Sequence, residues 1–126
     1  MPAETKYTSN EEWLSIDGDI GTVGITAYAQ EQLGDLVFVK LPKVGHHVTK
    51  GQEAAVVESV KAAYDVYAPV SGEVLAVNPA IVKEPGLVNA DAMGAGWFFK
   101  VRIAQQPDEI GDLMDESKYR EFHNKQ

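Results

Sequence analysis

Cysteine is absent from the 126-residue sequence. The chain therefore has no disulfide framework, no thiolate nucleophile and no cysteine ligand for a metal ion. If the protein takes part in thiol or disulfide chemistry, the sulfur atoms must arrive on a cofactor.

Long apolar runs are also missing. Apolar residues make up 44% and charged residues 24% of the chain, which is ordinary for a soluble globular protein. No stretch approaches the roughly 20 apolar residues that span a bilayer. The opening MPAETKYTSNEEW has neither a basic start nor an apolar core, which argues against a secretory or transit peptide. We expect a cytoplasmic protein without membrane insertion that folds as a single domain over residues 1–126.

Basic residues are fewer than acidic residues. Lysine and arginine number 11 against 19 aspartates and glutamates, which gives a formal net charge of -8. A negative chain repels phosphate backbones, so nucleic-acid binding is not expected. Partners that are steered by charge should present basic patches.

Strand-like segments dominate the central part of the chain. Their alternating or short apolar patterns are separated by Gly and Pro residues that favour turns. The segments cover residues 35–41, 52–60, 64–68, 73–77 and 97–103. Because this spacing is typical of sandwiches and barrels, we predict a mostly β protein with folded-over sheets.

Helical signals flank this region. Residues 26–33 contain good helix formers, with Thr26 as a plausible N-cap and Gly34 placed to end the helix. Residues 107–114 begin with a proline-led first turn and continue with apolar residues at helical spacing. A further helix is predicted from about residue 115, with two aromatic residues three positions apart. We expect these C-terminal helices to cover the sheet.

Lys61 is the residue that the strand pattern singles out. The strand-like run 56–60 leads into it, and two alanines lead out into the run 64–67, so we expect a hairpin tip. There the ammonium group would be held away from the sheet, where an acylating enzyme can close around it. A lysine at a hairpin tip can also be a solubilising charge, and spacing alone favours that plainer interpretation.

Other chemistries have little support in the sequence. His46, His47 and His123 have no acidic or cysteine partner at metal-ligand spacing, so we expect no metal site. Ser59 lacks both the glycine-flanked nucleophile elbow and an evident base. A Schiff-base enzyme would need Lys61 in an apolar pocket, whereas a hairpin tip lies in water. We therefore expect no catalytic residues and no enzyme activity of the chain's own.

Three longer segments carry a family resemblance. They are GITAYAQEQLGDLVFVKLP, VGHHVTKGQEAAVVESVKAAYDVYAPVSGEVLAVN and EPGLVNADAMGAGWFFKV. Together they closely resemble the glycine cleavage H-protein family, and the most specific parts are ESVKA around Lys61, YAPVSGEV and the GxGW element. The resemblance implies a barrel-sandwich hybrid fold, as in lipoyl and biotinyl domains, with N- and C-terminal extensions. It also implies lipoate in amide linkage to Lys61.

The same resemblance implies a carrier that is a substrate of other enzymes. A pyridoxal-phosphate glycine decarboxylase would load an aminomethyl group and release carbon dioxide. An aminomethyltransferase would pass the one-carbon unit to tetrahydrofolate, and dihydrolipoamide dehydrogenase would reoxidise the dithiol. Lipoyl-attaching enzymes that act on Lys61 are further partners. We expect this carrier of glycine catabolism and one-carbon metabolism to be a monomer.

Three polar residues match the cleft in which the family docks the loaded arm. They are Glu12, Asp65 and Asn10, and a carboxylate there would pair with the aminomethyl ammonium and shelter it from water. Each can also be an ordinary solvated surface group. The family often has histidine where this chain has Glu11, and a more polar first turn in the helix at 26–33, so the polar detail of the cleft differs here.

Two further interpretations remain open. Biotinyl domains and 2-oxoacid dehydrogenase lipoyl domains share the hairpin lysine but usually lie in longer chains. Biotinyl domains also usually place methionines beside that lysine, whereas Val60 and Ala62 flank Lys61. The chain could additionally serve as a lipoyl donor, and a lipoyl-transfer assay on the purified protein would test that role.

Overall fold

The computed structural model describes residues 4–104, 110–111 and 113–124 of the chain. Every strand-like run predicted from the sequence corresponds to a strand, and β1, β2, β3 and β5 add strands that were not predicted. In this part of the chain the strands are β1 (Glu4–Tyr7), β2 (Glu12–Asp17), β3 (Ile20–Ile25), β4 (Leu36–Lys40), β5 (His47–Val48), β6 (Glu53–Ser59), β7 (Ala63–Tyr67), β8 (Gly72–Val77) and β9 (Phe99–Ile103).

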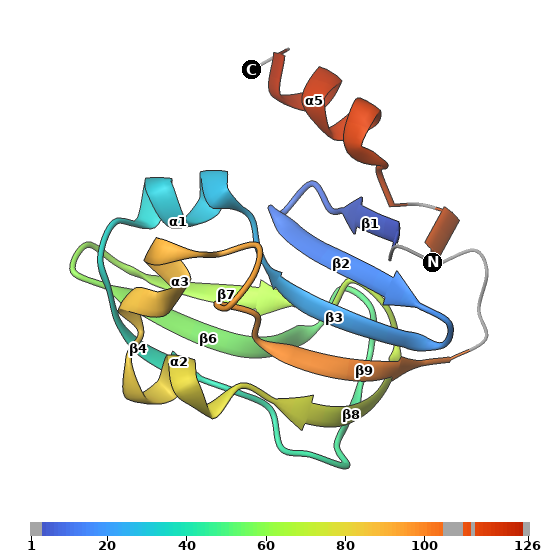
Figure 1. The fold of residues 1–126 in the computed structure, drawn as a ribbon, viewed down its shortest axis with the longest axis horizontal. Helices are drawn as coiled ribbons and strands as arrows, with labels where there is room; N and C mark the ends of the chain where they lie inside the picture. Colours follow the sequence, from blue (N-terminus) through green and yellow to red (C-terminus); the bar gives the residue numbers. More distant parts are fainter. Residues whose placement is uncertain (1–3, 105–109, 112, 125–126) are drawn as a thin grey trace.

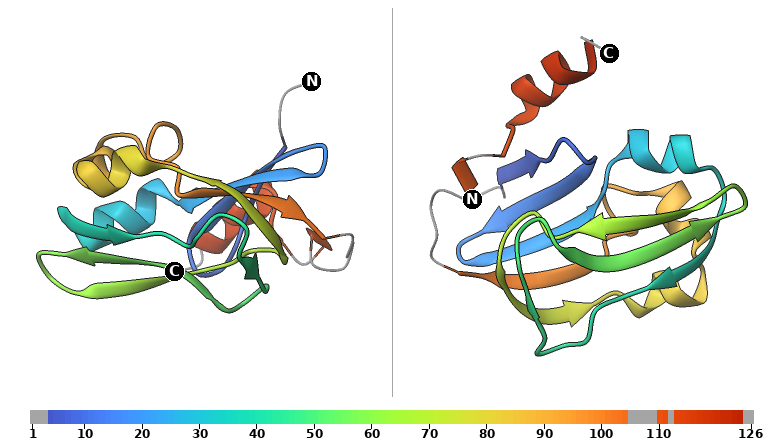
Figure 2. Two further views of the ribbon diagram at one scale, coloured as in Figure 1. Left: turned by 90° about the horizontal axis from the view of Figure 1, so that it is seen from below. Right: turned by 180° about the vertical axis from the view of Figure 1, so that it is seen from behind.

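These strands form two antiparallel sheets, which the views of Figures 1 and 2 show as two layers. The larger sheet has six strands in the order β1-β2-β3-β9-β8-β5, and the smaller has three in the order β4-β6-β7. β2 pairs with β3, and β6 pairs with β7, and each pair forms a hairpin. The arrangement confirms the predicted mostly β class and is consistent with a barrel-sandwich hybrid.

The core lies between the two sheets. Alternation along each strand directs every second side chain inward. Val57 and Val66 of the small sheet join Leu14, Val74 and Phe99 of the large sheet in one fully buried cluster. β-Branched and aromatic side chains pack well on pleated surfaces. Each Å² of apolar surface that they bury contributes about 25 cal/mol to folding, and this core supports the β6–β7 hairpin.

Helix α1 (Ala27–Leu33) begins and ends where the sequence predicts. The Thr26 hydroxyl accepts a hydrogen bond from Ala29 N at 3.1 Å and so satisfies one of the free N–H groups of the first turn. Gly34 ends the helix with φ of 79° and ψ of -158°, a combination that is open essentially only to glycine. Its N–H donates to the Gln30 carbonyl at 3.0 Å.

Two further short helices, α2 (Pro79–Lys83) and α3 (Gly86–Ala90), lie beside β4 and were not predicted. The Asn78 side chain caps α2 by accepting a hydrogen bond from Ala80 N at 3.2 Å. Figure 1 shows α3 near the connection between α1 and β4, at the same end of the molecule as the β6–β7 turn. None of the helices that the structure describes is long and apolar enough to span a membrane.

Helix α5 (Glu116–Asn124) confirms the helix predicted from about residue 115. Its Tyr119 ring stacks on Tyr7 of β1, with ring centroids 4.3 Å apart and planes at 12°. The stacked pair fastens α5 to the edge of the large sheet, and Figure 2 shows the helix beside β1.

The segment before α5 differs from the predicted helix over residues 107–114. Residues 107–109 and 112 lie outside the described residues, residues 110–111 are helical, and Met114 is not. Met114 instead forms an antiparallel bridge in which Tyr7 N donates to its carbonyl at 2.8 Å and its own N–H donates to Tyr7 O at 2.9 Å. Its backbone therefore supplies hydrogen-bond partners to the edge of β1. These hydrogen bonds outweigh the preference for a helix that the apolar spacing indicates.

Candidate functional site

Lys61 lies at the tip of the β6–β7 hairpin. Ser59 N donates to the Ala62 carbonyl at 2.8 Å, and the Ser59 hydroxyl accepts from both Lys61 N and Ala62 N at 3.1 Å. One serine side chain thus satisfies the N–H groups that a tight turn leaves unpaired. The Lys61 side chain is exposed, and its neighbour Val60 is 69% exposed. This geometry presents the amine to an approaching enzyme.

The loop between α1 and β4 supports the tip on one side. Val60 N donates to the Asp35 carbonyl at 3.1 Å. The Lys61 stem lies beside the helix end, because a methyl group built on Gly34 would come within 3.5 Å of Lys61 Cε. The hairpin tip is therefore attached to the body of the protein rather than projecting freely.

A cleft of about 260 Å³ opens between the start of β2 and the end of β7. Two of the residues predicted for the arm-docking cleft, Asn10 and Glu12, line it together. Its other lining residues come from β1, the turn before β2, the segments flanking β6 and β7, and the chain before α5: Tyr7, Thr8, Ser9, Lys50, Gly51, Tyr67, Ala68, Pro69, Leu113 and Met114.

The Glu12 side chain is only 1% exposed. Thr8 Oγ1 donates to Glu12 Oε1 at 2.6 Å, and Tyr67 N donates to Glu12 Oε2 at 3.2 Å. Burial raises the pKa of this carboxyl to about 7, against the two hydrogen bonds, which lower it, and with a smaller upward contribution from the charge of Glu11. Glu12 is thus poised between its neutral and ionised forms near neutral pH, so an arriving cation can shift it to the carboxylate.

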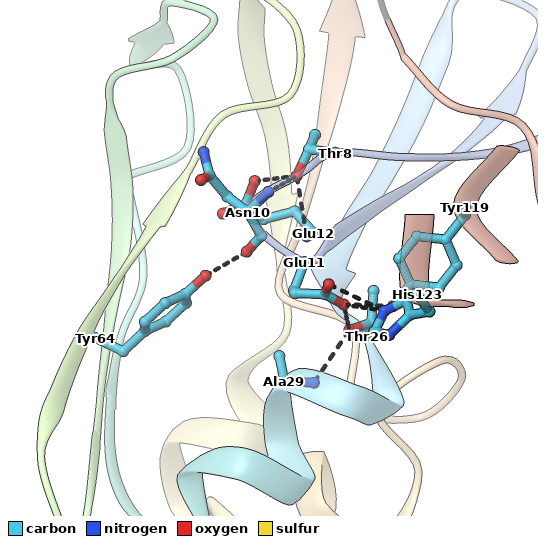
Figure 3. A network of polar contacts seen from close by, with 9 residues as sticks. All are labelled: Thr8, Asn10, Glu11, Glu12, Thr26, Ala29, Tyr64, Tyr119 and His123. Carbon is cyan, nitrogen blue, oxygen red and sulfur yellow. Dashed lines mark hydrogen bonds and ion pairs between the residues drawn. The ribbon is translucent and has the colours of Figure 1, made fainter. Parts of the chain in front are cut away.

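Tyr64 connects the hairpin to the cleft (Figure 3). It lies on β7, three residues after Lys61, and its hydroxyl donates to the Asn10 carbonyl. Asn10 N in turn donates to the Thr8 hydroxyl at 3.2 Å. Burial raises the pKa of the Tyr64 phenol, so it remains a donor. The turn that carries Asn10 and leads into Glu12 of β2 is thereby tied to the strand that follows the hairpin tip.

Asp65 and Lys61 do not line the cleft. Asp65 lies between Tyr64 and Val66 on β7, so strand alternation directs its side chain to the opposite sheet face from theirs. At about 3.3 Å per residue, β7 extends roughly 13 Å from Ala63 to Tyr67, and Lys61 lies beyond its start, in the turn. Lys61 and the cleft therefore lie at opposite ends of β7.

The sequence did not predict a polar cluster around Glu11, which Figure 3 shows beside α5. The Glu11 carboxylate accepts from Thr26 Oγ1 at 2.8 Å and from the Tyr119 hydroxyl, and it pairs with His123 Nε2 at 3.1 Å. Glu11 adopts a positive φ of 68°, unusual for a residue with a Cβ. This backbone turn lets neighbouring acids diverge, with Glu11 facing α5 and Glu12 entering the cleft. No signal in the sequence spacing could reveal contacts between residues 15 to 112 positions apart.

His123 lies half-buried in α5 against Tyr28 and Tyr119. His46 and His47 are exposed. Across residues 4–104, 110–111 and 113–124, no group of three or more His, Asp or Glu side chains is arranged to hold a metal ion.

Comparisons with known proteins agree with the fold. The family model described as "Glycine cleavage H-protein" matches residues 5–126. A glycine cleavage system H protein of Bradyrhizobium diazoefficiens is 62% identical over 92% of this chain and 94% of its own length. One from Parvibaculum lavamentivorans is 59% identical over 95% of both chains.

A crystal structure of a glycine cleavage system H protein from Mycobacterium marinum has the same fold. It superposes with a TM-score of 0.87 at 39% sequence identity and covers 98% of this chain and 99% of that one. The match extends over both sheets and the C-terminal region. The family model, the sequence identities and the shared fold together show that the chain belongs to the glycine cleavage H-protein family, the lipoyl carriers of the glycine cleavage system.

Proposed function

We propose that this chain is a cytoplasmic, monomeric shuttle that carries an aminomethyl group on a lipoyl arm attached to Lys61. The observation that carries the proposal is the exposed amine at the tip of a hairpin attached to the body on one side. Ala62 and Ala63, which follow Lys61, are small and exposed, so an acylating enzyme meets little steric hindrance there. The amine therefore fits amide formation with lipoate.

The lipoyl group, when bound, supplies the disulfide and dithiol chemistry that a chain without cysteine cannot supply itself. The chain contributes presentation and shelter. Its proposed partners are the pyridoxal-phosphate glycine decarboxylase, the aminomethyltransferase, dihydrolipoamide dehydrogenase and the enzymes that attach lipoate. In this scheme residues 1–126 act as one lipoyl-carrier domain with N- and C-terminal extensions, and the chain is their substrate rather than an enzyme.

A reconstituted exchange assay tests the shuttle role. The lipoylated protein alone should release no carbon dioxide from glycine, whereas addition of glycine decarboxylase should start the exchange of bicarbonate into glycine. The protein carrying Lys61→Arg should remain inactive with the same decarboxylase. Decarboxylation by the highly purified carrier alone, or full exchange with Lys61→Arg, would contradict the proposal.

We further propose that the cleft at Asn10 and Glu12 is where the loaded arm rests. An aminomethyl arm ends in an ammonium group, and an ammonium beside a carboxyl with a pKa of about 7 favours its ionised form. The oxidised arm has no such charge and gains nothing from Glu12. Docking is therefore expected to depend on the load. Asp65 does not line this cleft but shares a sheet face with Tyr67, which does, so it would act on the part of the arm that lies along β7.

The lifetime of the aminomethylated protein tests the docking proposal. Glu12→Gln removes a charged interaction on the order of 1–3 kcal/mol and should shorten the lifetime, while lipoylation stays intact. Glu73→Gln, the same change at an exposed position on β8, is the matched control and should leave the lifetime unchanged. Asp65→Asn measures the contribution of the second carboxylate. Equal lifetimes for the wild type and Glu12→Gln would rule out Glu12 as the docking group.

A further inference from the structure

We propose that Asn89, on helix α3, is a positioning residue for the Lys61 hairpin, because its side chain holds the loop on which the hairpin tip rests. Its effect on lipoylation rests on the proposed function of Lys61. Its effect on the hairpin itself does not, and the two can be measured separately.

Asn89 binds the α1–β4 loop on both sides of Asp35. Its Oδ1 accepts a hydrogen bond from Leu36 N at 2.9 Å, and its Nδ2 donates to the Gly34 carbonyl at 2.8 Å. The same Nδ2 also donates to Gln30 Oε1 of α1 at 3.0 Å. One amide side chain therefore satisfies a carbonyl beyond the end of α1 and the first N–H of β4, two groups that the regular elements leave unpaired.

The hairpin depends on the same loop through a single peptide unit. A peptide bond is planar and trans, so its N–H and its C=O point to opposite sides. The unit joining Asp35 to Leu36 places the Leu36 N–H on Asn89 and the Asp35 carbonyl on Val60 N, at 3.1 Å. Holding one side of this rigid plane therefore aims the other side at the residue next to Lys61.

The contact between Gly34 and the Lys61 stem reinforces this geometry. Asn89 fixes the Gly34 carbonyl, and the Lys61 Cε lies where it would meet a methyl group on Gly34 at 3.5 Å. Below the tip, β4 and β6 stay paired from Leu36 with Ser59 onward. Loss of Asn89 should therefore loosen the tip and the loop without separating the strands. An enzyme that acylates Lys61 would then meet a tip with a wider range of orientations.

Amide hydrogen exchange of the protein without lipoate provides the direct test. Asn89→Ala should speed exchange at Leu36 and Val60 by on the order of tenfold relative to amides in the middle of β6, since it removes the restraint on the shared peptide plane. Asn78→Ala is the matched control. The Asn78 side chain makes the same number of hydrogen bonds, to Ala80 N, Ala95 O and Trp97 O, but none of them is to the α1–β4 loop.

Lipoylation kinetics provide the second readout. The value of kcat/KM for lipoylation by a lipoate ligase should fall by on the order of tenfold for Asn89→Ala, because loss of a fixed orientation slows the reaction. It should stay near the wild-type value for Asn78→Ala and for Gln30→Ala, which leaves both backbone contacts of Asn89 in place. Circular dichroism confirms the fold of each variant, and Asn89→Asp, which loses the donor to Gly34, replaces Asn89→Ala if the latter is unfolded.

Unchanged exchange at Val60 in the Asn89 variant would overturn the inference, as would an equal fall in kcat/KM for Asn78→Ala. Failure of the wild type to accept lipoate at Lys61 would instead contradict the proposed function. In that case the exchange measurements still decide whether Asn89 positions the hairpin.

Discussion

The buried carboxyl of Glu12 makes the stability of the folded chain depend on pH. Glu12 is 1% exposed, and its pKa is about 7 against an ordinary value of 4.5. Between these values the folded chain holds a proton that the unfolded chain releases. The free energy of unfolding therefore falls as the pH rises from about 4.5 and levels off above about 7. Glu12→Gln removes this titration and should remove this part of the pH dependence.

The size of the effect follows from the two pKa values. At pH 5 the folded carboxyl is almost fully protonated, whereas most of the unfolded population is ionised, and at pH 8 both are ionised. Between pH 5 and pH 8 the wild type should lose unfolding free energy on the order of 2–3 kcal/mol through Glu12. The difference in unfolding free energy between Glu12→Gln and the wild type should shift in favour of Glu12→Gln by the same amount, because the remaining titrations are common to both proteins and cancel.

Urea unfolding at pH 5 and pH 8, at one ionic strength, measures this difference. The fluorescence of Trp13 and Trp97 reports the transition, and Glu73→Gln is the control for the same change at an exposed site. The control should follow the wild type at both pH values. If the difference between Glu12→Gln and the wild type is the same at pH 5 and pH 8, Glu12 does not have a raised pKa and the account of the cleft is wrong.

Two smaller predictions concern helix α1. Thr26→Ala removes both the cap on Ala29 N and a donor to Glu11, and it should lower the free energy of unfolding by on the order of 1–2 kcal/mol in urea titrations. Gly34→Ala forces a residue with a Cβ into a backbone conformation with φ of 79° and should cost on the order of 1–3 kcal/mol in the same assay. A loss below a few tenths of a kcal/mol in either variant would contradict the corresponding contact or strain.

Local signals predict the elements whose determinants are local. Thr26 and Gly34 define α1 because capping and a positive φ act within a few residues of the helix ends. The β6–β7 hairpin is predicted for the same reason, since two strand-like runs flank Lys61 and the two alanines that follow it. The N-terminal strands were missed because β2 and β3 mix apolar with small and polar residues, including Gly21 and Gly24, and acquire their pairing only in the sheet.

The site was predicted only in part, because its polar groups are assembled from distant segments. The resemblance proposes Asn10 and Glu12 for an arm-docking cleft, and both line the cleft beside β2, but the local sequence offers two adjacent acids and no reason to bury the second. That choice depends on the positive φ of Glu11 and on its contacts with residues 15 to 112 positions away in the sequence. Asn89 likewise has no local signal, since its partners on α1, the α1–β4 loop and β4 lie 53 to 59 residues earlier.

The most direct test of the carrier account is the site of lipoylation. Protein and a Lys61→Arg variant would be purified from a host that attaches lipoate, and their intact masses and peptide maps would be compared. We predict one lipoyl group in the wild type, on the peptide that contains Lys61, and none in Lys61→Arg. Lipoate on another lysine such as Lys50, or a lipoylated Lys61→Arg protein, would contradict the account.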